Sequence, residues 1–216
     1  MTSEATLREQ ICTLAKSMFD RGLTGGASGN ISARLVDGGL LVSPTGSSFG
    51  TLDPARLSHF DAGGRLIGGD VPTKEMPLHS AFYDTRSQTG AVVHLHSTHS
   101  VALSMLPDTD PDNVLPPLTA YSVMRLGKVK LLPYFMPGDP AMGEAVRGLA
   151  GKRAAVLLAN HGPVVAGKDI EAAVYAMEEL EETAKLALIT RGCNPQMLTA
   201  AQVNGIVDKF DVEWEA

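Results

Sequence analysis

Two histidines separated by one residue, His94 and His96, have the clearest potential for chemistry in this chain. They lie in an apolar run that we predict to form a buried strand over residues 92–96. Residues two apart on a strand point to the same face, roughly 6.6 Å apart along the chain, so both imidazoles can approach one cation. Two imidazoles on one face of a buried strand are costly unless something organises them. The pattern therefore favours a metal site.

Two further residues could complete that site. His161 follows a second apolar run at residues 154–159 and precedes Gly162-Pro163, so we expect it at a strand end facing a turn. A third imidazole and the carboxylate of Glu75 would give a four-coordinate site of the kind that zinc prefers. Glu75 has two interpretations that the residues alone leave open. It is either a glutamate that complements a helix dipole or an acid/base group beside the metal.

Three loops rich in small and hydroxyl-bearing residues contain groups that could bind a phosphate. They contribute backbone N–H groups, hydroxyls and one amine. Neither a glycine-rich dinucleotide fingerprint nor a Walker-type phosphate loop is present, so nucleotide binding is disfavoured. The candidate loops are Ser28-Gly29-Asn30, Thr45-Gly46-Ser47-Ser48 and Thr73-Lys74.

The remaining pattern predicts one domain of mixed α and β structure over residues 1–216. Asp169 is the expected N-cap of the longest helix, and its glutamate pairs at residues 178–179 and 181–182 are expected on a solvated face. Apolar periodicity and turn signals place helices at 4–21, 74–85 and 169–191, and strands at 31–35, 40–43, 57–60, 65–67, 92–96, 130–134 and 154–159.

Composition excludes several classes of protein. The formal net charge is −6 and no cluster of basic residues offsets it, which argues against a nucleic-acid partner. Two isolated thiols, Cys12 and Cys193, fit a reducing compartment better than a disulfide scaffold. The first residues lack a signal-peptide pattern, and no apolar run approaches the roughly 20 residues of a membrane span. We therefore expect a cytoplasmic protein with no membrane partner.

Five separated motifs together resemble the class II aldolase/adducin family, typified by L-fuculose-phosphate aldolase. The resemblance covers about residues 5–190 and implies a three-layer α/β/α sandwich with a central, largely antiparallel sheet. It also implies a homotetramer with active sites near the subunit interfaces. The motifs stand in the family's order as Ser28-Gly29-Asn30-Ile31-Ser32, Ser43-Pro44-Thr45-Gly46, Lys74-Glu75, Val93-His94-Leu95-His96-Ser97 and Ala159-Asn160-His161-Gly162.

The resemblance also implies roles for single residues. It implies a Zn²⁺ ion, with Mn²⁺ or Co²⁺ as alternatives, held by His94, His96 and His161. Glu75 would be a weak ligand and the acid/base group. Tyr134 matches a tyrosine that reaches a neighbouring subunit's active site as a proton donor. The family's phosphate-binding positions correspond to Asn30, Thr45, Gly46, Thr73 and Lys74.

Two departures from the fuculose type are similar to a different branch of the family, the 3-oxo-tetronate 4-phosphate decarboxylases. Fuculose-type aldolases carry two serines where this chain has Thr73-Lys74, and this chain has an insert at residues 110–113. That branch implies a metal-dependent lyase acting on a phosphorylated sugar acid. It would release CO2 and dihydroxyacetone phosphate through a metal-stabilised enediolate. A sugar-phosphate aldolase, an epimerase and a non-catalytic adducin-like module are the alternatives.

Overall fold

The computed structural model contains a central sheet of eight strands. It describes residues 3–214, so residues 1–2 and 215–216 of the expected 1–216 domain lie outside the described residues. All neighbouring strands are antiparallel except β6 and β7, which are parallel. The sheet order is β4-β3-β2-β1-β5-β8-β7-β6. The strands are β1 (Asn30–Arg34), β2 (Leu40–Val42), β3 (Ser58–Phe60), β4 (Leu66–Gly68), β5 (Ala91–His94), β6 (Lys130–Leu132), β7 (Ala155–Leu158) and β8 (Gly162–Gly167).

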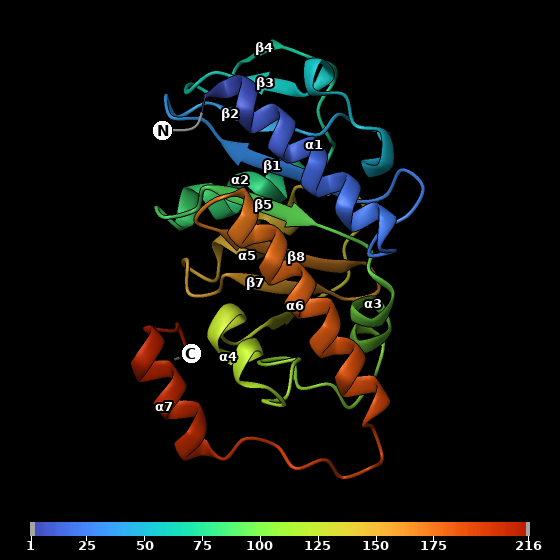
Figure 1. Cartoon of the computed structure of the whole chain (residues 1–216), viewed down its shortest axis with the longest axis vertical. Coiled ribbons are helices and arrows are strands. Elements are labelled where there is room, and N and C mark those ends of the chain that lie inside the picture. Colours follow the sequence, from blue (N-terminus) through green and yellow to red (C-terminus); the bar gives the residue numbers. More distant parts are fainter. Residues whose placement is uncertain (1–2, 215–216) are drawn as a thin grey trace.

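Helices cover both faces of the sheet, which confirms the three-layer α/β/α class. The long helices α1 and α6 cross the near face in Figure 1, and α2 and α5 lie behind the sheet. None of the helices within residues 3–214 has the length and apolarity needed to cross a membrane. The helices are α1 (Glu4–Asp20), α2 (Met76–Thr85), α3 (Thr98–Ser104), α4 (Ala120–Leu126), α5 (Ala141–Arg147), α6 (Ile170–Ile189) and α7 (Ala200–Phe210).

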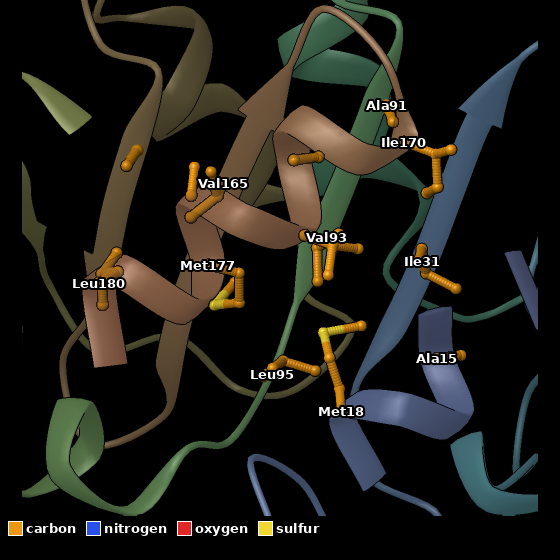
Figure 2. Close-up of a cluster of buried hydrophobic side chains, with 14 of the residues drawn as sticks. Ala15, Met18, Ile31, Ala91, Val93, Leu95, Val165, Ile170, Met177 and Leu180 are labelled. Carbon is orange, nitrogen blue, oxygen red and sulfur yellow. The ribbon is translucent and has the colours of Figure 1, made fainter. Parts of the chain in front are cut away.

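The alternation of side chains along β5 separates the core from the site. Val93 and Leu95 are fully buried against α1 and α6, in the larger hydrophobic cluster (Figure 2). Val92 packs in the second cluster, on the side of α2 and α5. Because successive strand residues point to opposite faces, His94 lies on the same side as Val92. The apolar residues thus fix the strand, and the histidine faces helix α2.

Several expected elements differ from those observed. Strand β5 ends at His94, so His96 lies just beyond the strand rather than inside it. The helix that begins after Asp169 ends at Ile189, and the Asp169 side chain accepts a hydrogen bond from the N–H of Ala172, as an N-cap does. The short helices α3, α4 and α5 and strand β8 had no clear periodic signal, because each spans only six or seven residues.

The expectation that Glu181 belongs to a solvated face is wrong. Glu181 is only 7% exposed and accepts hydrogen bonds from the backbone N–H groups of His99 (2.9 Å) and Ser100 (2.9 Å). These N–H groups belong to the first turn of α3, which lacks partners for them within the helix. A carboxylate from α6 therefore caps the helix that directly follows His96.

Candidate metal and catalytic site

Three imidazoles converge at one end of β5. The ring centroids of His94 and His96 are 5.0 Å apart, those of His94 and His161 4.9 Å, and those of His96 and His161 4.8 Å. One ligand atom from each ring lies within 4.8 Å of the others. His94 is fully buried, His161 is 8% exposed, and His96 is the most exposed of the three. The structure therefore brings together the three histidines that the sequence singled out.

The turn between β7 and β8 carries His161 to the end of β5. Asn160 has a φ of 56°, a left-handed conformation that asparagine adopts more readily than most residues. At Gly162 a Cβ atom would collide with the carbonyl of Leu95, so only glycine lets the two segments approach this closely. A tight turn and a missing side chain thus set the position of the third imidazole.

Glu75 stands immediately before α2 and faces two of the imidazoles. Its Oε2 lies 3.4 Å from Nε2 of His94, and its Oε1 lies 3.4 Å from Nε2 of His161. Asn30 donates a 2.6 Å hydrogen bond to Oε2. Burial opposes ionisation of Glu75, but His94, the Asn30 amide and His161 outweigh it, so the pKa of this carboxyl lies below its usual value. Glu75 is therefore a carboxylate at neutral pH.

The imidazoles are held in the neutral form that binds metals. Burial lowers the pKa of His94 to about 3, and burial also lowers the pKa values of His96 and His161, outweighing the opposing effect of the Glu75 carboxylate. His94 can donate from Nδ1 to the carbonyl of Pro163 (2.9 Å), which leaves the lone pair of its Nε2 facing His96 Nε2 at 3.1 Å. Histidines that bind a metal through one ring nitrogen commonly donate the N–H of the other to a backbone carbonyl.

The donor set fits a divalent cation. Both ring nitrogens of His161 are buried without a hydrogen-bond partner, and its Nε2 faces the cluster. Two neutral imidazole nitrogens 3.1 Å apart repel each other through their lone pairs unless a proton or a cation lies near both. Three imidazoles and one carboxylate are a ligand set that suits zinc and related transition metals. The three histidines could therefore hold a metal ion.

Sequence reasoning missed a polar chain behind Glu75. His79 is fully buried, and its ring nitrogens lie 2.5 Å from Asn30 Oδ1 and 2.7 Å from Ser32 Oγ. Ser32 Oγ also lies 2.9 Å from the hydroxyl of Tyr83. A signal for these residues was present, because Glu75, His79 and Tyr83 are spaced four apart and so share one face of a helix.

Two of the candidate phosphate loops, those of Thr45 and Thr73, are linked through the backbone. The Thr45 N–H donates to the carbonyl of Val71 (2.9 Å), which places this loop beside the segment leading to Thr73. Thr45 and Gly46 line a cavity of about 740 Å³. The hydroxyl of Thr73 accepts a hydrogen bond from the N–H of Glu75 (3.2 Å). A backbone hydrogen bond thus joins the Thr45 loop to the segment before Thr73, whose hydroxyl contacts the backbone of Glu75.

The other three predicted residues have different surroundings. The hydroxyl of Ser28 donates to the carbonyl of Gly25 at 2.7 Å, so it is engaged within its own loop. Lys74 is exposed and stands next to Glu75 in the chain. Tyr134 is 57% exposed and its hydroxyl donates to Sδ of Met136 at 3.1 Å. Within this chain, Tyr134 is not brought into the histidine cluster.

Comparison with known proteins places this geometry in a family. Residues 9–188 match the family model described as the class II aldolase and adducin N-terminal domain. The 3-oxo-tetronate 4-phosphate decarboxylase of Escherichia coli K12 is 48% identical over 200 residues, which cover 93% of this chain and 94% of that protein. The L-fuculose phosphate aldolase of the same strain is 30% identical over 208 residues, 94% of each chain.

A solved structure agrees with these sequence matches. The crystal structure of YgbL from Escherichia coli superposes with a TM-score of 0.91 at 47% identity, covering 94% of this chain and 98% of that one. The match to the family model spans well over half of the chain and includes Glu75 and all three clustered histidines. The chain therefore belongs to the class II aldolase and adducin family.

Proposed function

We propose that this protein is a carbon–carbon lyase that decarboxylates a 3-oxo-tetronate 4-phosphate to dihydroxyacetone phosphate and CO2. The observation that carries the proposal is the placement of the Glu75 carboxylate against His94 and His161, each at 3.4 Å. This pairing puts a proton-carrying group beside a candidate metal site. The choice of substrate rests on the 48% identity to a decarboxylase of that name, compared with 30% to an aldolase.

We assign the metal site to His94, His96 and His161, with Glu75 as a weak ligand. Zn²⁺ is the proposed ion, and Mn²⁺ or Co²⁺ could replace it, because neutral imidazoles suit all three. When bound, the cation would act as a Lewis acid that polarises the substrate ketone and stabilises the negative charge that develops on it.

The reaction needs one proton to be moved, and Glu75 is the group that can move it. Loss of CO2 leaves an electron pair on the carbon next to the ketone, delocalised as an enediolate, and that carbon must then be protonated. The Glu75 carboxylate takes a proton from water and passes it to this carbon. An aldolase makes the same enediolate by releasing an aldehyde instead of CO2, so the leaving group decides between the two reactions.

Substrate binding is assigned to the loops around the site. Ser28, Asn30, Thr45, Gly46 and Thr73 would hold the phosphate through backbone N–H groups and polar side chains. Backbone pairing of the Thr45 loop with the segment before Thr73 supports this grouping. Since Tyr134 is exposed, we propose that the working form is a homotetramer in which Tyr134 reaches the active site of a neighbouring subunit.

Lys74 is the cation that we expect to recognise the phosphate or the carboxylate of the substrate. Replacing it by serine (Lys74→Ser) should raise KM about 10- to 100-fold and leave kcat nearly unchanged, because a charge-assisted hydrogen bond contributes about 1.5–3 kcal/mol. Steady-state kinetics would measure both constants. Lys168→Ser is the matched control, since Lys168 is also exposed but follows the opposite end of β8. Unchanged KM and kcat in Lys74→Ser would show that Lys74 does not contact the substrate.

The substrate assignment is tested by product analysis. Purified protein loaded with Zn²⁺ is incubated with an enzymatically generated 3-oxo-tetronate 4-phosphate and, separately, with fuculose 1-phosphate. We expect CO2 and dihydroxyacetone phosphate from the first and no cleavage of the second. Aldehyde release from fuculose 1-phosphate without CO2 release from the 3-oxo acid would instead establish the aldolase.

A further inference from the structure

Five buried polar residues form one continuous hydrogen-bonded chain that ends on Glu75. Successive heavy-atom distances along it, starting from the tyrosine hydroxyl, are 2.9, 2.7, 2.5 and 2.6 Å. Each member is at most 8% exposed. Leu78 and Phe82, in the same helix, are fully buried and apolar, so apolar side chains do pack in this layer. The members of the chain, in order, are Tyr83, Ser32, His79, Asn30 and Glu75.

Hydrogen-bonding chemistry imposes one direction on this chain. An ionised carboxylate only accepts, so Asn30 must turn its NH2 group toward Glu75 and its Oδ1 toward His79. Oδ1 is an acceptor, so Nε2 of His79 must carry the hydrogen. A neutral imidazole has one N–H, which makes Nδ1 an acceptor for the hydroxyl of Ser32. The hydroxyl of Tyr83 then donates to Ser32 Oγ.

His79 is the member that fixes the orientation of the amide. The two ends of an asparagine side chain have the same shape and exchange by a half-turn, so shape alone does not decide which end faces Glu75. The Nε2–H of His79 does decide the orientation of the Asn30 amide, because a flipped Asn30 would place its NH2 group against this N–H. It would also place its oxygen against the carboxylate.

We propose that His79 is a positioning residue for the reaction: it locks the Asn30 amide so that its N–H holds the Glu75 carboxylate against His94 and His161. The inference rests on the proposed role of Glu75. It assigns Asn30 a task beside its expected phosphate contact, since the Nδ2–Oε2 hydrogen bond is the one that orients the carboxylate. Strands β1 and β5 pair Asn30 directly with His94, so the amide and the imidazole are built on one rigid frame.

A double-mutant cycle tests whether His79 acts through Asn30. His79→Leu and Asn30→Ala should each lower kcat about 10- to 100-fold, the usual range for groups that orient a metal-site residue. The double variant should be no slower than the slower single variant, because both remove the same support. Since His79 does not touch the substrate, KM in His79→Leu should stay within about twofold of the wild type.

Two further variants separate positioning from loss of stability. His79→Gln retains an N–H donor near the position of Nε2 and should recover most of kcat. Phe82→Leu weakens the packing of the same buried layer but leaves every member of the hydrogen-bonded chain unchanged. This variant should lower the melting temperature while kcat is retained. If His79→Leu does not fold, His79→Gln and Asn30→Ala are compared directly, and His79→Gln should have the higher kcat; equal losses of kcat in the two variants would then overturn the proposal.

The direction of the hydrogen-bonded chain can also be tested by a measurement that does not depend on catalytic activity. Nitrogen-15 NMR of protein labelled in its imidazole rings should show His79 as the neutral Nε2–H tautomer. Additive losses in the cycle, unchanged kcat in His79→Leu, or an Nδ1–H tautomer would each overturn the proposal. If the wild type releases no CO2, the proposed function fails, and the tautomer measurement still decides whether the chain has the stated direction.

Discussion

Replacing His161 by alanine should abolish both metal binding and turnover. Its ring lies 4.9 Å from that of His94 and 4.8 Å from that of His96, and it is the one clustered histidine delivered by the β7–β8 turn. Loss of a third imidazole leaves two nitrogen ligands and a weak carboxylate, too few to retain zinc tightly. Lewis-acid catalysis contributes several kcal/mol, so kcat/KM should fall by roughly 10³-fold or more.

Metal content measured by elemental mass spectrometry should fall in parallel with activity, from one ion per chain to near zero. His59→Ala is the matched control. His59 lies in β3, where its Nδ1 is 3.4 Å from Glu4, and it belongs to no described cluster with the three histidines. That control should retain both metal and turnover. Stoichiometric metal in His161→Ala would contradict the assigned ligand set.

The second large effect is expected for Glu75→Gln. Glutamine has the size and shape of glutamate, but it cannot carry a proton between water and carbon. Positioned acid/base groups contribute about 10²- to 10⁴-fold, so kcat should fall within that range. The histidines remain in place, so metal content should be largely retained. Comparing kcat and bound metal in one preparation would separate this effect from the loss in His161→Ala.

The pH dependence of the wild type gives an independent check on Glu75. Its pKa is lowered because the neighbouring histidines and Asn30 outweigh burial, so the carboxylate stays ionised as the pH falls from neutral. Between about pH 8 and pH 6, kcat should therefore not decline through protonation of Glu75. A kcat for Glu75→Gln equal to that of the wild type would show that Glu75 does not transfer the proton.

The site was accessible from sequence where the pattern was local. The spacing of His94 and His96 predicted that their imidazoles would meet, and they do so although His96 lies past the end of β5. The strands around the site were recognisable because they are apolar and bounded by turn residues. Motif order linked them to distant Glu75 and His161, which no periodicity could have paired.

Long-range contacts that no motif marks were not predictable. Helix α3 has seven residues, and the carboxylate that caps it comes from Glu181, more than eighty positions later. The helix propensity of the residues around Glu181 does not predict a contact with a distant helix, so Glu181 was wrongly expected on a solvated face. The role of His79 was similarly hidden. A single buried histidine is usually structural, and only tertiary structure shows Asn30 and Ser32 on either side of its ring.

The place of β1, β5 and β8 in the middle of the sheet has a consequence for how the site responds to local opening. Asn30 lies on β1, His94 ends β5 and His161 immediately precedes β8, and these three strands are neighbours with further strands on both sides. Central strands open only with the whole fold, whereas edges and termini fray at much lower free energy. The arrangement of these side chains should therefore persist through the fluctuations that loosen the sheet edges, so the proposed metal site would stay preformed when no ion is bound.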